Sequence, residues 1–178
     1  REGENLASQM YFPLRKEKDE SVLLQLTLTA GEFEDEFLGM HLVNVATGLP
    51  HNAYLGAAAV SSLNENNRNT AVKWLADMLY FNVPASPVFV EGILETVIAT
   101  KSDDAFLLFC REVSTSEEGT FNAVQLRSLA AAYDEATGES GALSRLANRK
   151  KEQSESIGRV RIRIADAVAF RTGKMHDT

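Results

Sequence analysis

The feature that most constrains the fold is a helical pattern that recurs along the chain at a nearly constant interval. It is clearest in Thr70–Ser86, where Leu75, Met78 and Leu79 fall on one apolar stripe of an amphipathic helix. Pro84 closes this helix, because proline lacks an amide donor and disfavours helical angles in the residue before it. The stretch therefore predicts one helix followed by a turn.

The same outline returns upstream and downstream of this helix. Three further helices after a glycine or a capping residue are expected within Thr29–Pro50, Ala99–Val113 and Ala136–Lys151. Four positions taken as equivalent are separated by 35, 34 and 37 residues: Glu36, Ala71, Ala105 and Ala142. Another helix precedes each of the four, namely Val22–Ala30, Ala53–Leu63, Val88–Ala99 and Val124–Ala136.

A period of this length is typical of an α-solenoid, in which each helix pair buries its apolar face on the next pair. The sequence therefore predicts an all-α fold, an α-solenoid of about four and a half antiparallel helix pairs. An irregular helical bundle is the alternative. We expect an N-terminal arm over residues 1–19, a helical-repeat domain over residues 20–151, and a basic C-terminal helix with a tail over residues 152–178. This last helix would begin an incomplete fifth repeat, although its RVRIRI segment also alternates as a strand does.

Local signals add expectations about helix ends and the core. Asn69 or Thr70 is expected to cap one helix and Ser102 another, because short polar side chains accept hydrogen bonds from free amides in the first turn. The phase of the apolar stripes places Leu75 and Leu108 between helices.

Charge is unevenly distributed over the 178 residues, whose net charge is −7. Residues 1–144 carry nine basic and 21 acidic side chains, a balance that repels a phosphate backbone. Residues 145–178 carry nine basic and four acidic side chains. Six of these basic residues are candidates for contact with RNA phosphates or an acidic protein surface, and otherwise form a solvated helix face: Arg149, Lys150, Lys151, Arg159, Arg161 and Arg163.

The sequence predicts no catalytic residues, no metal site and no cofactor. None of the common nucleotide-binding, serine-hydrolase or zinc-protease motifs occurs. His41 has no ligand partner at a recognised spacing, and we expect it on a helix surface or partly buried. Cys110, the only cysteine, is expected to be a buried and inert thiol in a reducing compartment. No apolar run approaches the length of a membrane span.

Trp74, Tyr80 and Phe81 form an aromatic group on one helix. Packing between repeats accounts for such a group, and any exposed part of it is a candidate docking patch for a partner protein.

The unit Asn52–Ser86 resembles a pentatricopeptide repeat. It has the alanine early in the second helix, the methionine seven residues later and the closing proline of that family, as Ala71, Met78 and Pro84. The third unit keeps the alanine but has Glu112 at the methionine position. The tetratricopeptide repeat is the close rival, with a similar alanine and a length of about 34 residues.

The resemblance implies an organelle, mostly mitochondria or chloroplasts, and often binding of single-stranded RNA. In that family the bases are read by a polar residue early in the first helix and by another at the end of each unit. Those positions are here Ala57 and Glu91, with Ser86 as the closing residue of the second unit. The alanine side chain cannot form a hydrogen bond with a base, and glutamate repels phosphate. The sequence therefore does not support recognition of one RNA base by each repeat.

From these observations we expect a non-enzymatic scaffold or adaptor subunit of a large organellar complex, in the mitochondrial matrix. A ribonucleoprotein such as the mitochondrial ribosome or an RNA-processing complex is the first candidate. Its partners would be other protein subunits, with RNA backbone at the basic C-terminal segment, and without a membrane span or a small-molecule substrate. The alternatives are a module that binds organellar RNA directly and a tetratricopeptide-like interaction domain outside any ribonucleoprotein.

Overall fold

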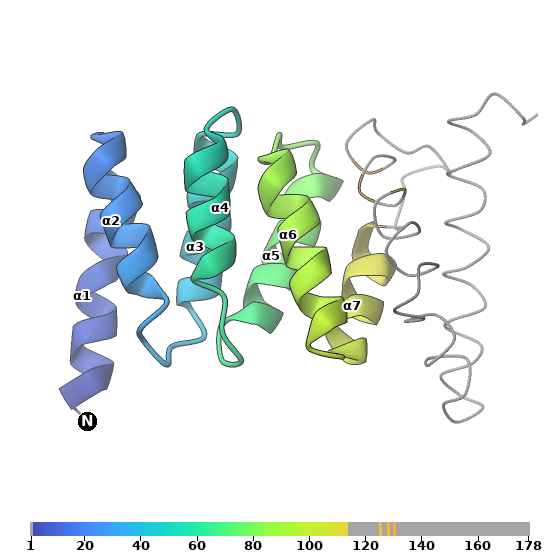
Figure 1. Ribbon diagram of the computed structural model, residues 1–178, viewed down its shortest axis with the longest axis horizontal. Coiled ribbons are helices and arrows are strands. Elements are labelled where there is room, and N and C mark those ends of the chain that lie inside the picture. The colour runs from blue at the N-terminus through green and yellow to red at the C-terminus, as the bar shows by residue number, and fades with distance from the viewer. Residues whose placement is uncertain (1, 114–124, 126–127, 129, 131–178) are drawn as a thin grey trace, which may run out of the picture.

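The computed structural model describes residues 2–113 together with Gln125, Ser128 and Ala130 (Figure 1). This part of the chain contains seven helices and no strand, which confirms the predicted all-α class there. The helices are α1 (Glu2–Lys16), α2 (Glu20–Ala30), α3 (Leu38–Gly48), α4 (Ala53–Ser61), α5 (Arg68–Tyr80), α6 (Pro87–Ala99) and α7 (Asp103–Val113). The helices expected from Val124 onward lie, apart from the three residues named above, outside the described residues.

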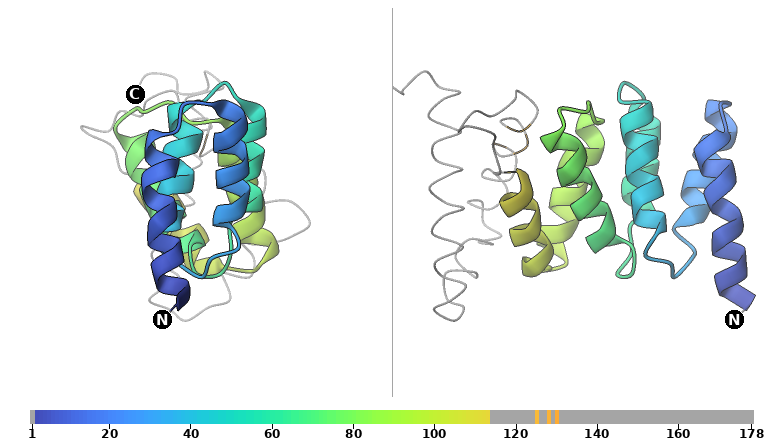
Figure 2. Two further views of the ribbon diagram at one scale, coloured as in Figure 1. Left: turned by 90° about the vertical axis from the view of Figure 1, so that its left-hand side faces the viewer. Right: turned by 180° about the vertical axis from the view of Figure 1, so that it is seen from behind.

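The helices stand in two rows. One row contains α2, α4 and α6, and the other contains α1, α3, α5 and α7. Within each row successive helices pack against each other, and the rows meet where α1 and α3 contact α2, α3 contacts α4, and α6 contacts α7. The chain alternates between rows, so that all helices of one row begin at the same end of the molecule (Figure 1). Seen along the long axis, the two rows lie side by side (Figure 2).

Contacts between neighbours in a row join residues at a nearly constant separation in sequence. Hydrogen bonds that link one helix or turn to its equivalent span 30 to 35 residues. The pairs are Glu20 with Asn52, Thr27 with Ser62, Gly31 with Asn64, and Asn44 with Trp74. Residues separated by about the repeat length seen in the sequence are therefore in contact in the structure.

Small residues stand where neighbouring helices approach most closely. A Cβ atom added at Gly39 of α3 would lie 2.1 Å from the carbonyl oxygen of Asn67 and 2.8 Å from the amide nitrogen of Ala71. A Cβ atom at Gly92 of α6 would likewise lie 2.6 Å from the side chain of Val60 on α4. Such separations are too short for any side chain, so glycine sets the spacing at these crossings.

The structure differs from the sequence-based expectation at the N-terminus. The arm expected over residues 1–19 is instead helix α1 over Glu2–Lys16, which packs against α2 and α3. Leu14 is buried, and Met10 and Tyr11 pack against the core. These three side chains form a short apolar stripe that the charged run after it obscures. Pro13 lies in the last turn of α1, where its missing amide removes one i→i−4 hydrogen bond of the helix.

Two helix starts also differ from expectation. Helix α3 begins only at Leu38 of the expected Thr29–Pro50 stretch, because the Asp35 side chain accepts a hydrogen bond from the Phe37 amide and holds a turn there (2.8 Å). Glu36 is exposed in that turn. The α3 residue that faces Ala71 is therefore Gly39, not the Glu36 that the spacing pairs with it.

Helix α5 begins at Arg68, so Asn67 occupies the N-cap position expected for Asn69 or Thr70. The Asn67 side chain makes no capping bond to its own helix and donates instead to the Ser62 carbonyl oxygen (3.0 Å). The Asn67 side chain therefore stabilises the turn between α4 and α5 instead of capping α5.

The predicted end of α5 is confirmed, and its geometry explains it. Asn82 adopts a left-handed conformation with φ of 58°. The Val83 amide donates to the Met78 carbonyl oxygen (2.9 Å) and the Asn82 amide to that of Leu79 (3.1 Å), which is the Schellman pattern of a helix terminus. In the core, Leu75 is fully buried as expected, whereas Leu108 is only partly buried.

Candidate interaction surface

The outer side of the row formed by α2, α4 and α6 presents matching exposed positions. They recur 32 to 34 residues apart, at the i, i+3 and i+7 positions of each helix, and all are exposed. We call this surface the α2–α4–α6 face. Its residues are Val22, Gln25 and Thr29 on α2, Tyr54, Ala57 and Ser61 on α4, and Val88, Glu91 and Glu95 on α6.

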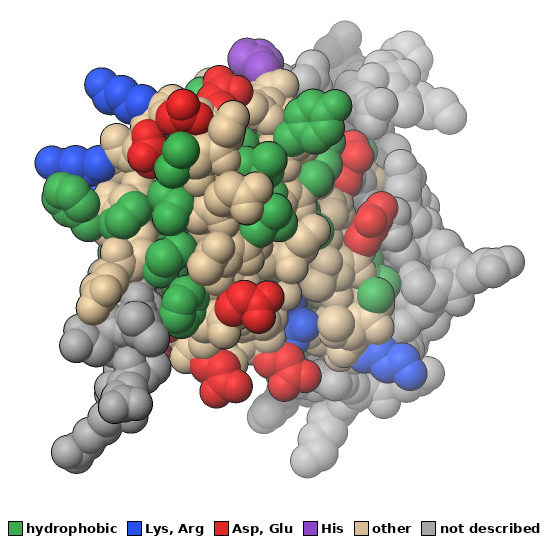
Figure 3. All heavy atoms as spheres, turned by 60° about the vertical axis from the view of Figure 1, so that its left-hand side comes forward, with side chains coloured by type: hydrophobic (Ala, Val, Ile, Leu, Met, Phe, Trp, Pro, Cys, Tyr) green, Lys and Arg blue, Asp and Glu red, His purple; other side chains and the backbone are tan. Residues whose placement is uncertain are grey.

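Apolar side chains occupy the first of these positions on every helix. Val22 is 45%, Tyr54 81% and Val88 39% exposed, and each lies in the first turn of its helix. Because these three helices begin at the same end of the molecule, the three side chains form one row across the face. Figure 3 views this side obliquely from the α1–α2 end, with hydrophobic and neutral side chains over much of the surface.

The charge on the α2–α4–α6 face has a single sign. Helices α2, α4 and α6 contain no lysine or arginine, and their only charged residues are Glu20, Glu91 and Glu95, all exposed. By contrast, α5 in the other row carries both Lys73 and Asp77. A face with acidic groups alone attracts cations and repels phosphates.

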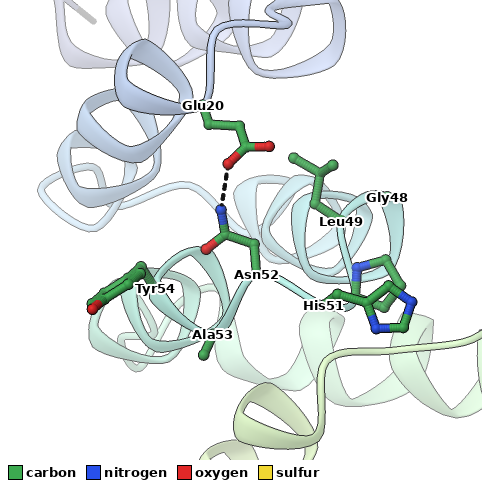
Figure 4. Close-up of a pocket in the computed structure, with 8 residues that line it drawn as sticks. Glu20, Gly48, Leu49, His51, Asn52, Ala53 and Tyr54 are labelled. Carbon is green, nitrogen blue, oxygen red and sulfur yellow. Dashed lines mark hydrogen bonds between the residues drawn. The ribbon is translucent and has the colours of Figure 1, made fainter.

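A shallow depression of about 560 Å³ lies at the end of this face where α2 and α4 begin. Figure 4 shows Glu20 at its rim, with one carboxylate oxygen accepting a hydrogen bond from Asn52 Nδ2 (2.7 Å). Leu49 and His51 form another side of it, and the Tyr54 ring is directed away from His51. The depression therefore offers one oriented carboxylate beside apolar surface.

The aromatic group predicted as core or docking patch is divided between these two roles. Trp74 packs partly against the core and donates from Nε1 to the Asn44 side chain (3.1 Å). Phe81 is 72% exposed, and its ring meets the Tyr80 ring edge-on with centroids 5.2 Å apart. The exposed part of the group is thus its Tyr80–Phe81 end, at the end of α5.

The positions that would read RNA by resemblance are unsuited to it. Ala57 and Glu91 are exposed at equivalent places on α4 and α6. Ser86 is fully buried, and its amide donates to the Ala46 carbonyl oxygen (3.0 Å). A closing residue that is inaccessible cannot form hydrogen bonds with a base.

A buried polar group joins α1 to α3. His41 is 8% exposed, and its ring stacks on the Tyr11 ring with centroids 4.8 Å apart. The Tyr11 hydroxyl donates to Asp35 Oδ2 (2.5 Å).

Burial and the hydrogen bond to Asp35 raise the pKa of Tyr11. Burial, and next the positive charge of Arg15, lower the pKa of His41, while Asp35 acts in the opposite direction. His41 therefore lies on a helix as predicted, but it is buried rather than at the helix surface or partly buried.

The lowered pKa of His41 predicts a loss of stability in mild acid. Its folded-state pKa lies below the unfolded value of about 6.5, so folding favours the neutral ring. The stabilising contribution is complete above the unfolded pKa and declines as the pH falls toward the folded pKa. Urea unfolding between about pH 7.5 and 5.5 should show a larger loss in the wild type than in His41→Gln. Equal losses in the two proteins would show that His41 is not the group responsible.

The remaining candidates carry no site in the described residues. Cys110 is fully buried, and burial raises the pKa of its thiol, as expected for an inert cysteine. Across residues 2–113, no cluster of three or more histidine, cysteine or acidic side chains could hold a metal ion. No helix in the described part has the length and apolarity needed to cross a membrane. The six basic candidates from Arg149 to Arg163 lie outside the described residues.

Over residues 2–113, the fold is an all-α stack of antiparallel helices. Comparisons with protein-family models, curated proteins and solved structures give no match.

Proposed function

We propose that the protein is a non-enzymatic scaffold that binds partner proteins along its helix rows. The observation that carries this proposal is the α2–α4–α6 face, where equivalent positions on three helices repeat exposed apolar side chains. Exposed apolar groups that recur in line across packed helices are characteristic of a protein-binding surface.

The proposed architecture is an α-solenoid of helix pairs related to pentatricopeptide or tetratricopeptide repeats. It is supported by the 30 to 35 residues that separate hydrogen-bonded neighbours in the rows. It is also supported by Ala71, which lies against Gly39 at a close crossing, as the small residue of such repeats requires. Each unit of a solenoid contacts mainly its neighbours, which leaves long surfaces for partners.

The organellar setting and the ribonucleoprotein rest on the resemblance and on the uneven charge. In that proposal the acidic body contacts protein subunits, while the basic residues between Arg149 and Arg163 approach RNA phosphates. A module that reads RNA bases directly is the weaker alternative, because Ser86 is buried and Glu91 is acidic. A tetratricopeptide-like interaction domain outside any ribonucleoprotein would use the same face.

Affinity purification of the full chain from its own cells, with and without ribonuclease, tests the proposal. A scaffold held by protein contacts should retain at least one stoichiometric protein partner after the RNA is digested. Release of every partner by ribonuclease would contradict it and favour the RNA-binding module. In the same preparation, binding to several single-stranded RNAs should show no preference for sequence.

A further inference from the structure

We propose that the α2–α4–α6 face binds a basic amphipathic segment of a partner protein. This inference rests on the proposed scaffold function and specifies the chemistry of the partner. It follows from two properties that coincide on this face: its apolar row and its exclusively acidic charge.

The acidic charge of this face predicts a positively charged partner segment. Glu20, Glu91 and Glu95 lie on three helices without any basic side chain, so no cation on these helices neutralises them. Glu20 is additionally held in place by Asn52, which leaves its second oxygen free to accept from an incoming lysine or arginine. A complementary partner carries basic residues, while RNA and anionic membranes are repelled.

The apolar row determines that the partner is also amphipathic. Val22, Tyr54 and Val88 remain exposed although their helix neighbours are buried. With packed helices about 8–10 Å apart, the row spans roughly 20 Å. An α-helix rising 1.5 Å per residue crosses that distance in about 13 residues, which is three to four turns of a partner helix.

The residues beside the apolar row are neutral on α2 and α4 and acidic on α6. Gln25, Ala57 and Ser61 lie on the C-terminal side of Val22 and Tyr54, and on α6 the corresponding positions are Glu91 and Glu95. A segment lying along the apolar row can therefore approach the backbone over α2 and α4 and place its basic side chains near Glu20 at one end and the α6 glutamates at the other. This arrangement requires apolar and basic groups on separate sides of the partner segment.

A model peptide tests the inference on the full chain. The probe is a fluorescein-labelled amphipathic 14-residue peptide of leucine and lysine, and its control has glutamate in place of lysine. Fluorescence anisotropy should detect binding of the lysine peptide alone. Glu91→Lys with Glu95→Lys should weaken binding about tenfold, because two attractive charges become repulsive. Tyr54→Ser should weaken it by a similar factor through loss of an aromatic contact.

A matched pair of substitutions separates this site from the general attraction of an acidic protein for a cation. Glu34 and Glu65 are exposed in turns outside the α2–α4–α6 face. Glu34→Lys with Glu65→Lys changes the net charge equally and should alter the affinity less than about twofold. Equal weakening by both pairs, or no effect of Tyr54→Ser, would overturn the proposed site.

The result is distinguishable from failure of the scaffold function. If the lysine peptide does not bind while a protein partner survives ribonuclease treatment, the basic-segment inference is wrong and the scaffold proposal stands. If no protein partner survives, the scaffold proposal itself fails.

Discussion

Replacing Gly39 by alanine should destabilise the protein by about 3 kcal/mol, although alanine favours helices. The added Cβ would lie 2.1 Å from the Asn67 carbonyl oxygen and 2.8 Å from the Ala71 amide nitrogen. Both are backbone atoms in or beside the first turn of α5, so no side-chain rotation relieves the overlap. The helices α3 and α5 must separate, which disturbs the packing around Leu75.

The same substitution at Gly48, in the last turn of the same helix, provides the control. A Cβ atom there would meet nothing within 4 Å. Gly48→Ala should therefore be neutral or stabilise by up to about 1 kcal/mol, through helix propensity alone. Urea unfolding followed by circular dichroism compares the two variants. Similar stabilities for Gly39→Ala and Gly48→Ala would mean that α3 and α5 do not approach as closely as the structure places them.

Most of the helical pattern in the described region could be predicted from the sequence. Helices α4 and α6 carry apolar stripes bounded by turn residues, and α5 ends at Asn82 before Pro84. These signals are local, because periodicity, capping and proline act within a few residues. Side-chain burial followed from the same phase at Leu75, but only partly at Leu108.

The remaining features depend on contacts between distant residues. The polar segment before Asp19 forms α1 because Leu14 finds a buried position against the other helices. Gly39 rather than Glu36 faces Ala71, since the turn held by Asp35 shifts the start of α3. A constant repeat length read from the sequence does not show that one turn delays the start of one helix by a few residues.

The α2–α4–α6 face was not predicted, although its residues were visible. Tyr54 and Val88 are 34 residues apart, and a search for apolar residues that fall outside the buried stripe at this period would have found them. The sequence instead indicated the group of Trp74, Tyr80 and Phe81, of which the structure packs Trp74 partly against the core. Whether an aromatic side chain is exposed depends on the neighbouring helix, which composition and spacing do not specify.

We propose that this protein acts by binding another protein on the α2–α4–α6 face. Photo-crosslinking from that face would capture such a partner in place. The photoreactive amino acid p-benzoylphenylalanine replaces Tyr54, which is already aromatic and exposed, in the full chain within its own cells. The matched control places it at Lys73, which is exposed on α5 in the other row.

We expect a discrete protein adduct from position 54 and none from position 73, read by gel shift and identified by mass spectrometry. The adduct at position 54 should resist ribonuclease and should disappear when Glu91 and Glu95 are both replaced by lysine. An adduct from position 73 alone, or a ribonuclease-sensitive adduct at position 54, would show that the α2–α4–α6 face does not bind a partner protein.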